Sequence, residues 1–225
     1  MQTGEQPLVY ALLGDIVASK THHRRDELQG RVVEALAAVD ERVPGVQPLE
    51  VTIGDEFQGA YGSLADAVRA SLLIRLVLLP RVDARFGIGS GRVTVFDDTR
   101  RPLSQDGPAW WAAREAINHV HRHQQRSAHE RAIRTWFVAG PSPEDRAGRS
   151  GADQFVNAHL LCRDALVPRD DDRAVALLRG WLLGRTQVDL AAEVGISQSA
   201  VSQRLGRMGA LAIRDSFDLL AAGQS

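Results

Sequence analysis

The stretch EVTIGDEFQGAY, residues 50–61, places an acidic pair, Asp55 and Glu56, in a short turn between two apolar runs. Runs of β-branched and aromatic residues joined tightly at Gly54-Asp55 are typical of a β-hairpin. Taken alone, a Gly-Asp pair in such a hairpin most often only turns the chain. Whether these carboxylates also hold a metal ion depends on what the rest of the chain places beside them.

The segments around this hairpin predict the element order β-α-β-β-α-β. The expected elements are a strand over residues 8–17, a helix over 26–43, the hairpin, a helix over 63–79 and a strand over 84–96, the last with a bulge or turn at its glycines. This order predicts an α/β (α+β) fold with a ferredoxin-like core, in which the first strand lies in the sheet beside the hairpin. Asp15, at the end of the first strand, should therefore lie near Asp55.

The stretch TQVDLAAEVGISQSAVSQRLGRMG, residues 186–209, predicts a second unit. Leu190 and Val194 form the apolar face of one short helix, Gly195 ends it, and Val201 and Leu205 form the inner face of the next helix. This pattern is typical of a helix-turn-helix, here preceded by a supporting helix over 173–183. A helical hairpin used only for packing or dimerisation is the alternative.

The second helix of a helix-turn-helix lies in the major groove of double-stranded DNA. The outward polar residues of this helix are Gln198, Ser199, Ser202, Gln203, Arg204 and Arg207. Side chains of these types hydrogen-bond base edges and phosphates, so double-stranded DNA is the expected partner.

Composition sets the expected class of protein. The 225 residues suffice for one large and one small domain, and we expect a division into residues 1–167 and 168–225. A hydrophobic content of 44% and a charged content of 24% are ordinary for a globular chain, and no apolar run is long enough to cross a bilayer. We therefore expect a cytoplasmic protein without a membrane partner. The net charge of −1 gives no overall attraction to DNA, whereas residues 196–214 carry three arginines and no carboxylate.

Asp15, Asp55 and the adjacent Glu56 form a donor set that suits Mg²⁺ or Mn²⁺ bound together with a triphosphate. Four segments resemble, in chain order, the motifs of class III nucleotidyl cyclases: LLGDIVAS (12–19), TIGDEF (52–57), FGIGSGRVTV (86–95) and AARE (112–115). GDEF also resembles the signature of diguanylate cyclases. The full chain, with a helix-turn-helix after a short cyclase-like domain, resembles the bacterial SatD family.

The resemblance to the cyclases implies roles for particular residues. Asp15, Asp55 and Glu56 would ligate the metal, Arg114 would steady the phosphates in the transition state, and nucleotide contacts would fall at Ile16, Val51, Gly54 and Arg114. A homodimer is also implied. The chain departs from the cyclase pattern at Trp110, where an Asn is usual, and at the base-selecting position, which is Val51. It departs from the diguanylate cyclases at Ile53, where a glycine is usual.

Two readings of function follow. The leading prediction is a DNA-binding regulatory protein whose cyclase-like domain binds a nucleoside triphosphate with Mg²⁺, which alters dimer geometry and hence DNA binding. The alternative is an active nucleotidyl cyclase or nucleotidyltransferase that makes a cyclic or oligonucleotide signal, so enzyme activity stays open. Two further motifs are expected to be structural: GIGSG (87–91) as a bulge or turn, and His119 with His123 as part of a solvated helix face.

Overall fold

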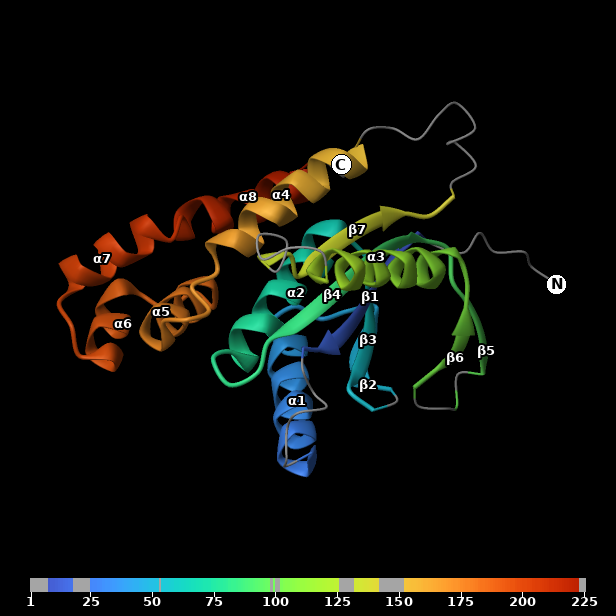
Figure 1. The fold of residues 1–225 in the computed structure, drawn as a ribbon, viewed down its shortest axis with the longest axis horizontal. Helices are drawn as coiled ribbons and strands as arrows, with labels where there is room; N and C mark the ends of the chain where they lie inside the picture. The colour runs from blue at the N-terminus through green and yellow to red at the C-terminus, as the bar shows by residue number, and fades with distance from the viewer. Residues whose placement is uncertain are drawn as a thin grey trace.

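The computed structural model describes residues 8–17, 25–52, 54–97, 99, 102–125, 132–141 and 152–222. Within these ranges the chain is a mixed α/β structure with a five-stranded sheet and eight helices (Figure 1). The strands are β1 Val9–Ile16, β2 Gln47–Val51, β3 Glu56–Tyr61, β4 Ala84–Gly91, β5 Thr94–Asp97, β6 Ser104–Asp106 and β7 Thr135–Ala139. The helices are α1 Arg25–Asp40, α2 Leu64–Leu78, α3 Pro108–Gln124, α4 Ala152–Leu166, α5 Asp172–Leu182, α6 Gln187–Val194, α7 Gln198–Arg207 and α8 Ala210–Ala222. No helix in the described ranges is both long and apolar enough to span a bilayer.

The strand order of the main sheet is β2-β3-β1-β4-β7. β1 is antiparallel to both of its neighbours, with Asp15 opposite Glu56 on β3 and opposite Arg85 on β4. β7 is added parallel to β4 at the edge. The predicted order β-α-β-β-α-β and the predicted position of the first strand beside the hairpin are therefore confirmed.

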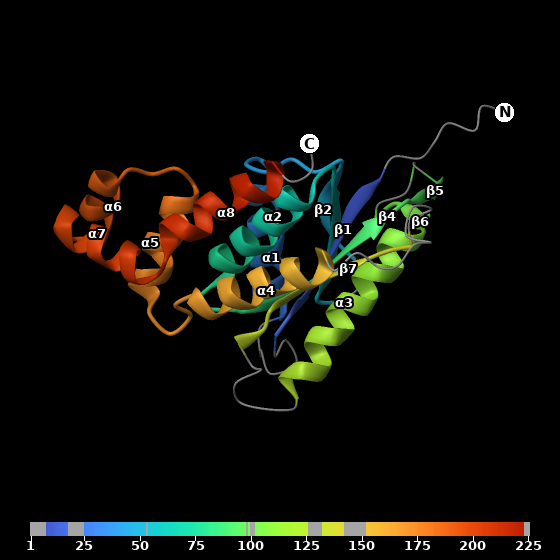
Figure 2. The same cartoon turned by 90° about the horizontal axis from the view of Figure 1, so that it is seen from above.

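Helices cover the two faces of the sheet unequally. α1 and α2 lie on one face and α3 lies on the other (Figure 2). Leu12 and Ile16 of β1 belong to the large core on the α1 and α2 side, whereas Leu13 belongs to the smaller cluster that includes Ala113 of α3. Because side chains alternate along a strand, Asp15 faces α3.

The glycines of β4 let α3 lie directly on the sheet. A Cβ atom at Gly87 would clash with backbone atoms of Ala113 and Ile117, and one at Gly89 with backbone atoms of Ala113 and Ala109. The expected bulge or turn at residues 87–91 is wrong, because these residues pair regularly with β1. The predicted strand over 84–96 is also divided: β5 leaves the main sheet and forms a two-stranded ribbon with β6.

The open edge of β7 is covered by side chains of α4 rather than by another strand. Asn157 accepts from the backbone N–H of Phe137 and donates to its carbonyl, both at 2.8 Å. Asp164 accepts from the N–H of Thr135 at 2.7 Å. These bonds satisfy backbone groups that an edge strand otherwise leaves available for pairing with another chain.

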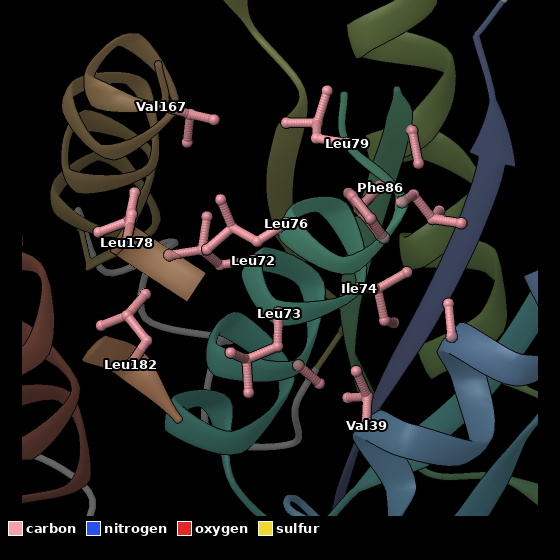
Figure 3. Close-up of a cluster of buried hydrophobic side chains, with 14 of the residues drawn as sticks. Val39, Leu72, Leu73, Ile74, Leu76, Leu79, Phe86, Val167, Leu178 and Leu182 are labelled. Carbon is pink, nitrogen blue, oxygen red and sulfur yellow. The ribbon is translucent and has the colours of Figure 1, made fainter. Parts of the chain in front are cut away.

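α2 lies between the sheet and the C-terminal helices. Figure 3 shows Ile74 directed toward Val39 and Phe86, whereas Leu72 and Leu73 are directed toward Leu178 and Leu182 of α5. All of these side chains belong to one buried apolar cluster, which continues into α7 and α8. The C-terminal helices therefore share a core with the sheet.

A buried ionic network lies at one end of α2. Asp83 accepts from Arg75 Nε and Arg134 Nε, each at 2.8 Å, and the Arg75 side chain is 1% exposed. Burial alone would raise the pKa of Asp83, but Arg75 and Arg134 outweigh that effect, so the pKa of Asp83 is lowered. The network stabilises the junction of α2 with β4 and the chain that enters β7.

Candidate functional site

Asp15 stands at the end of β1 with two basic partners. The residue is only 8% exposed, and its Oδ2 accepts from Arg85 Nε at 3.0 Å and lies 2.9 Å from His121 Nε2. Arg85 is the cross-strand neighbour of Asp15 on β4, and His121 belongs to α3. The sequence analysis did not assign Arg85 or His121 to the site. The alternation of β4 could have identified Arg85, which falls on the same face as Gly87.

Glu56 and Arg114 form the second part of the site. Arg114 Nη1 and Nη2 donate to Glu56 Oε1 and Oε2, both at 2.9 Å, which is a bidentate arrangement. The side chain of Arg114 is 48% exposed and that of Glu56 is 39% exposed. The hydrogen bonds that Arg114 donates to Glu56 raise the pKa of Arg114, and the charges of Glu56 and Asp15 add to this effect. α3 thus brings Arg114 beside Glu56 at the end of β3 that follows the hairpin turn.

Asp55 lies in the hairpin turn, next to Gly54. Gly54 has a φ of 73°, a left-handed conformation that glycine adopts without strain. Burial is the main cause that raises the pKa of Asp15; Arg85 and His121 oppose it, and the charge of Asp55 adds to it. The two aspartates therefore lie within electrostatic range of each other.

The residues at this end of the sheet include carboxylate oxygens of the kind that bind divalent cations. Two neighbouring carboxylates are hard oxygen donors of the kind Mg²⁺ prefers, and a cation would relieve the repulsion between Asp15 and Asp55. One oxygen of Asp15 is bonded to Arg85 and His121, however, and both oxygens of Glu56 are bonded to Arg114. Within the described ranges no cluster of three or more His, Cys, Asp or Glu has metal-binding geometry. The donor chemistry fits one cation held by Asp15 and Asp55, with Glu56 committed to Arg114.

The other predicted nucleotide contacts fall in different environments. Ile16 is 1% exposed and its side chain lies in the core, and Val51 packs against the same core. Gly54 is exposed at the turn. Val51 is the cross-strand partner of Phe57 on β3, and the preceding residue, Glu50, is the partner of Gln58. The sequence analysis gave Glu50 no role. A shift of one residue in register decides which face of the sheet a strand residue occupies, and the local sequence does not determine that register.

The histidines of α3 are not on a fully solvated face as expected. His119 stacks on Trp136 of β7, with ring centroids 4.0 Å apart, and on His123 at 4.1 Å. β7 therefore covers part of this face of the helix.

The C-terminal helices have well-defined ends. Thr186 and Asp189 form a reciprocal capping box at the start of α6, and Gly195 ends the helix with a φ of 70°. Ser197 caps α7 by accepting from the N–H of Ala200. Val201 is fully buried on the inner face of α7. Two short helices joined by a tight turn, as the sequence predicts, are therefore present.

The predicted DNA-contacting residues lie mainly on the outer side of α7. The residues that are exposed are Gln198, Ser199, Ser202, Gln203 and Arg207. Arg204 differs from them because its Nη1 lies 3.4 Å from Asp171 Oδ2, just before α5. Arg204 is therefore drawn back toward the supporting helix.

The five-stranded sheet with helices on both faces is similar in fold to solved catalytic domains of nucleotidyl cyclases. Residues 9–138 match the SatD family, and the chain belongs to that family. No curated protein matches the chain.

Three of the similar solved structures are distant in sequence from this chain. A bacterial light-regulated adenylyl cyclase is 16% identical with a TM-score of 0.47; the match covers 60% of this chain and 43% of that one. The guanylate cyclase domain of RhGC from Catenaria anguillulae, in complex with GTP, is 20% identical with a TM-score of 0.41 and coverages of 50% and 73%. The adenylyl cyclase CyaB from P. aeruginosa is 11% identical with a TM-score of 0.37 and coverages of 49% and 70%. The chain thus spans less than half of the first of these proteins, and similarity at this level concerns the fold alone.

Proposed function

We propose that this SatD-family chain is a DNA-binding regulatory protein whose cyclase-like part binds a nucleoside triphosphate with Mg²⁺. The observation that carries the proposal is the outer face of α7. It presents amide, hydroxyl and guanidinium groups to solvent, and residues 196–214 contain no carboxylate that would repel a phosphate backbone. Exposed groups of these kinds on the second of two short helices suit insertion into the major groove.

The roles of individual residues on α7 follow from their positions. Gln198, Ser199 and Ser202 lie in its first turns, the part of a recognition helix that meets base edges. Arg207 lies at the opposite end of the helix and would neutralise a phosphate. Gln203 and Arg204 complete the predicted contact surface, Arg204 after release from Asp171.

The nucleotide would bind at the acidic end of the sheet. Asp15 and Asp55 would hold Mg²⁺, which when bound would neutralise the triphosphate and lower the pKa of an attacking hydroxyl. Arg114 would exchange its bond to Glu56 for bonds to the phosphates. The exchange would cost little free energy, because ion pairs as exposed as Arg114–Glu56 contribute only about 0.2–1 kcal/mol to stability. Glu56 would then be available as a further ligand.

A signal from this site would reach α7 through the core that α2 shares with α5 and α8. In a homodimer, small shifts of the C-terminal helices would change the spacing of two recognition helices on two half-sites.

The test of DNA binding uses fluorescence anisotropy with labelled duplex DNA at several salt concentrations. We expect affinity to fall with salt, and Arg207→Ala to lower the slope of log affinity against log salt by about 1. Arg42→Ala, which removes an exposed arginine just after α1, is the control and should leave the slope unchanged. Absence of salt-dependent DNA retention by the wild-type protein would refute the proposal.

The convergence of Asp15, Asp55 and Arg114 also favours the alternative, an active nucleotidyl cyclase or nucleotidyltransferase. The protein would be incubated with each of the four triphosphates and Mg²⁺ or Mn²⁺, and the products resolved. A product made by the wild type and lost in both Asp15→Ala and Asp55→Ala would establish an enzyme. Triphosphate binding without a product would leave the regulatory role.

A further inference from the structure

A cavity lies between α1 and β2, the strand at one edge of the main sheet. Its volume of about 400 Å³ falls within the range of small-ligand pockets, about 300–1,000 Å³. Most of its wall is apolar and consists of Val33, Leu36 and Ala37 of α1, Leu49 and Val51 of β2, and Pro102 before β6. The other two wall residues, Asp40 and Glu50, are acidic. We call this space the α1–β2 cavity.

The walls of the α1–β2 cavity are held in place by hydrogen bonds. Asp40 Oδ2 accepts from the backbone N–H of Leu49 at 2.8 Å, which joins the end of α1 to β2. Gln47 Nε2 donates to Gln105 Oε1 at 2.8 Å, which joins β2 to the ribbon that follows Pro102. Three segments that are distant in the sequence are thus fixed around one space, as in the largely pre-formed pockets that bind small molecules.

Negative charge is concentrated at one end of the cavity. Asp40 Oδ1 is buried and has no hydrogen-bond partner among the described residues. Burial is the main cause that raises the pKa of Asp40; the N–H of Leu49 opposes it, and the charge of Glu50 adds to it. Two carboxylates of the wall therefore lie within electrostatic range of each other.

The end of α1 adds to this negative potential. Asp40 is the last residue of α1, and the aligned peptide dipoles of a helix place partial negative charge at its C-terminus. A basic residue commonly offsets that charge, but the last turn of α1 contains none. None of the described wall residues is basic either. A cation in the cavity would therefore be stabilised by Asp40, Glu50 and the helix terminus together.

The wall suits an organic cation better than a metal ion. Mg²⁺ keeps most of its water shell when it binds, and the apolar wall offers that water no hydrogen bonds. A primary ammonium group carries three N–H donors, which suit carboxylate oxygens such as those of Asp40. The carbon body attached to the ammonium would fill the apolar part of the cavity and remove Val33, which is 51% exposed, from water.

We propose that the α1–β2 cavity is a binding site for a small organic cation, a primary amine with a compact apolar body, whose ammonium group is held by Asp40 and Glu50. The site lies beside α1, on the face of the sheet opposite α3 and its Arg114. It is therefore separate from the proposed nucleotide site, and its occupancy requires neither a triphosphate nor DNA.

The test is an NMR chemical-shift titration of the isotope-labelled full chain at neutral pH, without nucleotide, using three indole compounds. Tryptamine, tryptophol and indole-3-propionate share one apolar body and end in an ammonium, a hydroxyl and a carboxylate group. We expect tryptamine to bind at least about tenfold more tightly than tryptophol, since charge-assisted hydrogen bonds are about twice as strong as neutral ones. Indole-3-propionate should bind most weakly, and the amides of Ala37, Leu49 and Val51 should shift most.

Three variants separate the contributions to binding. Asp40→Asn removes the charge but keeps an acceptor for the N–H of Leu49; it should weaken tryptamine binding about tenfold and leave tryptophol binding nearly unchanged. Glu34→Gln removes an exposed charge of α1 that is not part of the cavity wall, and should leave the preference for tryptamine intact. Ala37→Leu places a good helix former in the cavity and should weaken tryptamine and tryptophol alike.

Thermal unfolding of each variant verifies that it is folded, and Ala37→Leu still tests the site if Asp40→Asn is not. Equal affinities for tryptamine and tryptophol, or an unchanged preference in Asp40→Asn, would overturn the assignment of a cation. Failure of tryptamine to bind, or shifts confined to residues outside the cavity wall, would overturn the site itself. None of these results depends on whether the chain binds a triphosphate.

Discussion

Replacing Gly89 by alanine tests whether α3 owes its position to the glycines of β4. A Cβ atom at Gly89 would clash with backbone atoms of Ala113 and Ala109. Backbone atoms cannot rotate away as a flexible side chain can, so α3 would have to move as a body. That movement would also strain the bond between Arg114 and Glu56.

The expected magnitude follows from the two opposing effects. Overpacking of a tight core typically costs about 1–3 kcal/mol, and the rigidity of both elements places Gly89→Ala at the upper end of this range. Alanine also lowers the conformational entropy of the unfolded chain, which stabilises the folded protein by only about 0.4–1 kcal/mol. We therefore expect a net loss of about 2 kcal/mol in the free energy of unfolding, or about 4–8 °C in Tm for a chain of this length.

The chain supplies a matched control. Gly30 lies within α1, and a Cβ atom there would meet no atom within 4 Å. Gly30→Ala should therefore stabilise the protein by about 0.5–1 kcal/mol, because glycine is unfavourable inside a helix. Urea unfolding of both variants at the same pH measures the difference. If Gly89→Ala proves as stable as the wild type, the close contact of α3 with β4 is not what positions the helix.

Two other predictions concern charged groups. Asp171→Asn should raise DNA affinity about 1.4- to 5-fold in anisotropy titrations, because it releases Arg204 from an exposed ion pair that contributes about 0.2–1 kcal/mol. Asparagine should still cap the start of α5. Asp170→Asn is the control and should not raise the affinity; equal effects of the two substitutions would count against a specific role of the Arg204–Asp171 pair. The lowered pKa of Asp83 means that its pairing with Arg75 stabilises the fold fully above the ordinary aspartate pKa of about 3.9, and that this stability is lost as the pH falls through the lower pKa of the folded state. Asp83→Asn should cost about 3–5 kcal/mol in urea unfolding at pH 7 because it leaves a buried arginine uncompensated, and a loss below 1 kcal/mol would show that the network contributes little.

Turn and cap residues in the sequence predict where most helices and strands begin and end. The hairpin at Gly54-Asp55, the start of α2 at Ser63 and the end of α6 at Gly195 depend on turn and cap chemistry within a few residues, and each lies where the sequence predicts it. The order of these elements then determines that β1 lies beside β3, so the proximity of Asp15 to the hairpin was predictable.

What the sequence did not reveal depends on register between distant segments. Arg85 reaches Asp15 because β4 pairs with β1 in one particular register, and His121 reaches it because glycines allow α3 to lie close to β4. The face occupied by Glu50 depends on an irregularity of β2 that shifts its register against β3. A shift of one residue exchanges the two faces of a strand, so the local sequence around Val51 could not establish the register of β2.

The position of α2 explains how the two candidate sites could influence each other. The backbone N–H of Val17, two residues after Asp15, donates to the carbonyl of Asp83 at 2.9 Å, and Asp83 is paired with Arg75 of α2. α2 in turn shares its apolar core with α5, α7 and α8. Movement of α7 independent of the sheet would expose that core to water, at a cost of about 25 cal/mol for each Å² of apolar surface. Any effect of a nucleotide on DNA binding should therefore arise from small concerted shifts of α2 with the C-terminal helices, because free hinge motion would separate surfaces that the fold keeps buried.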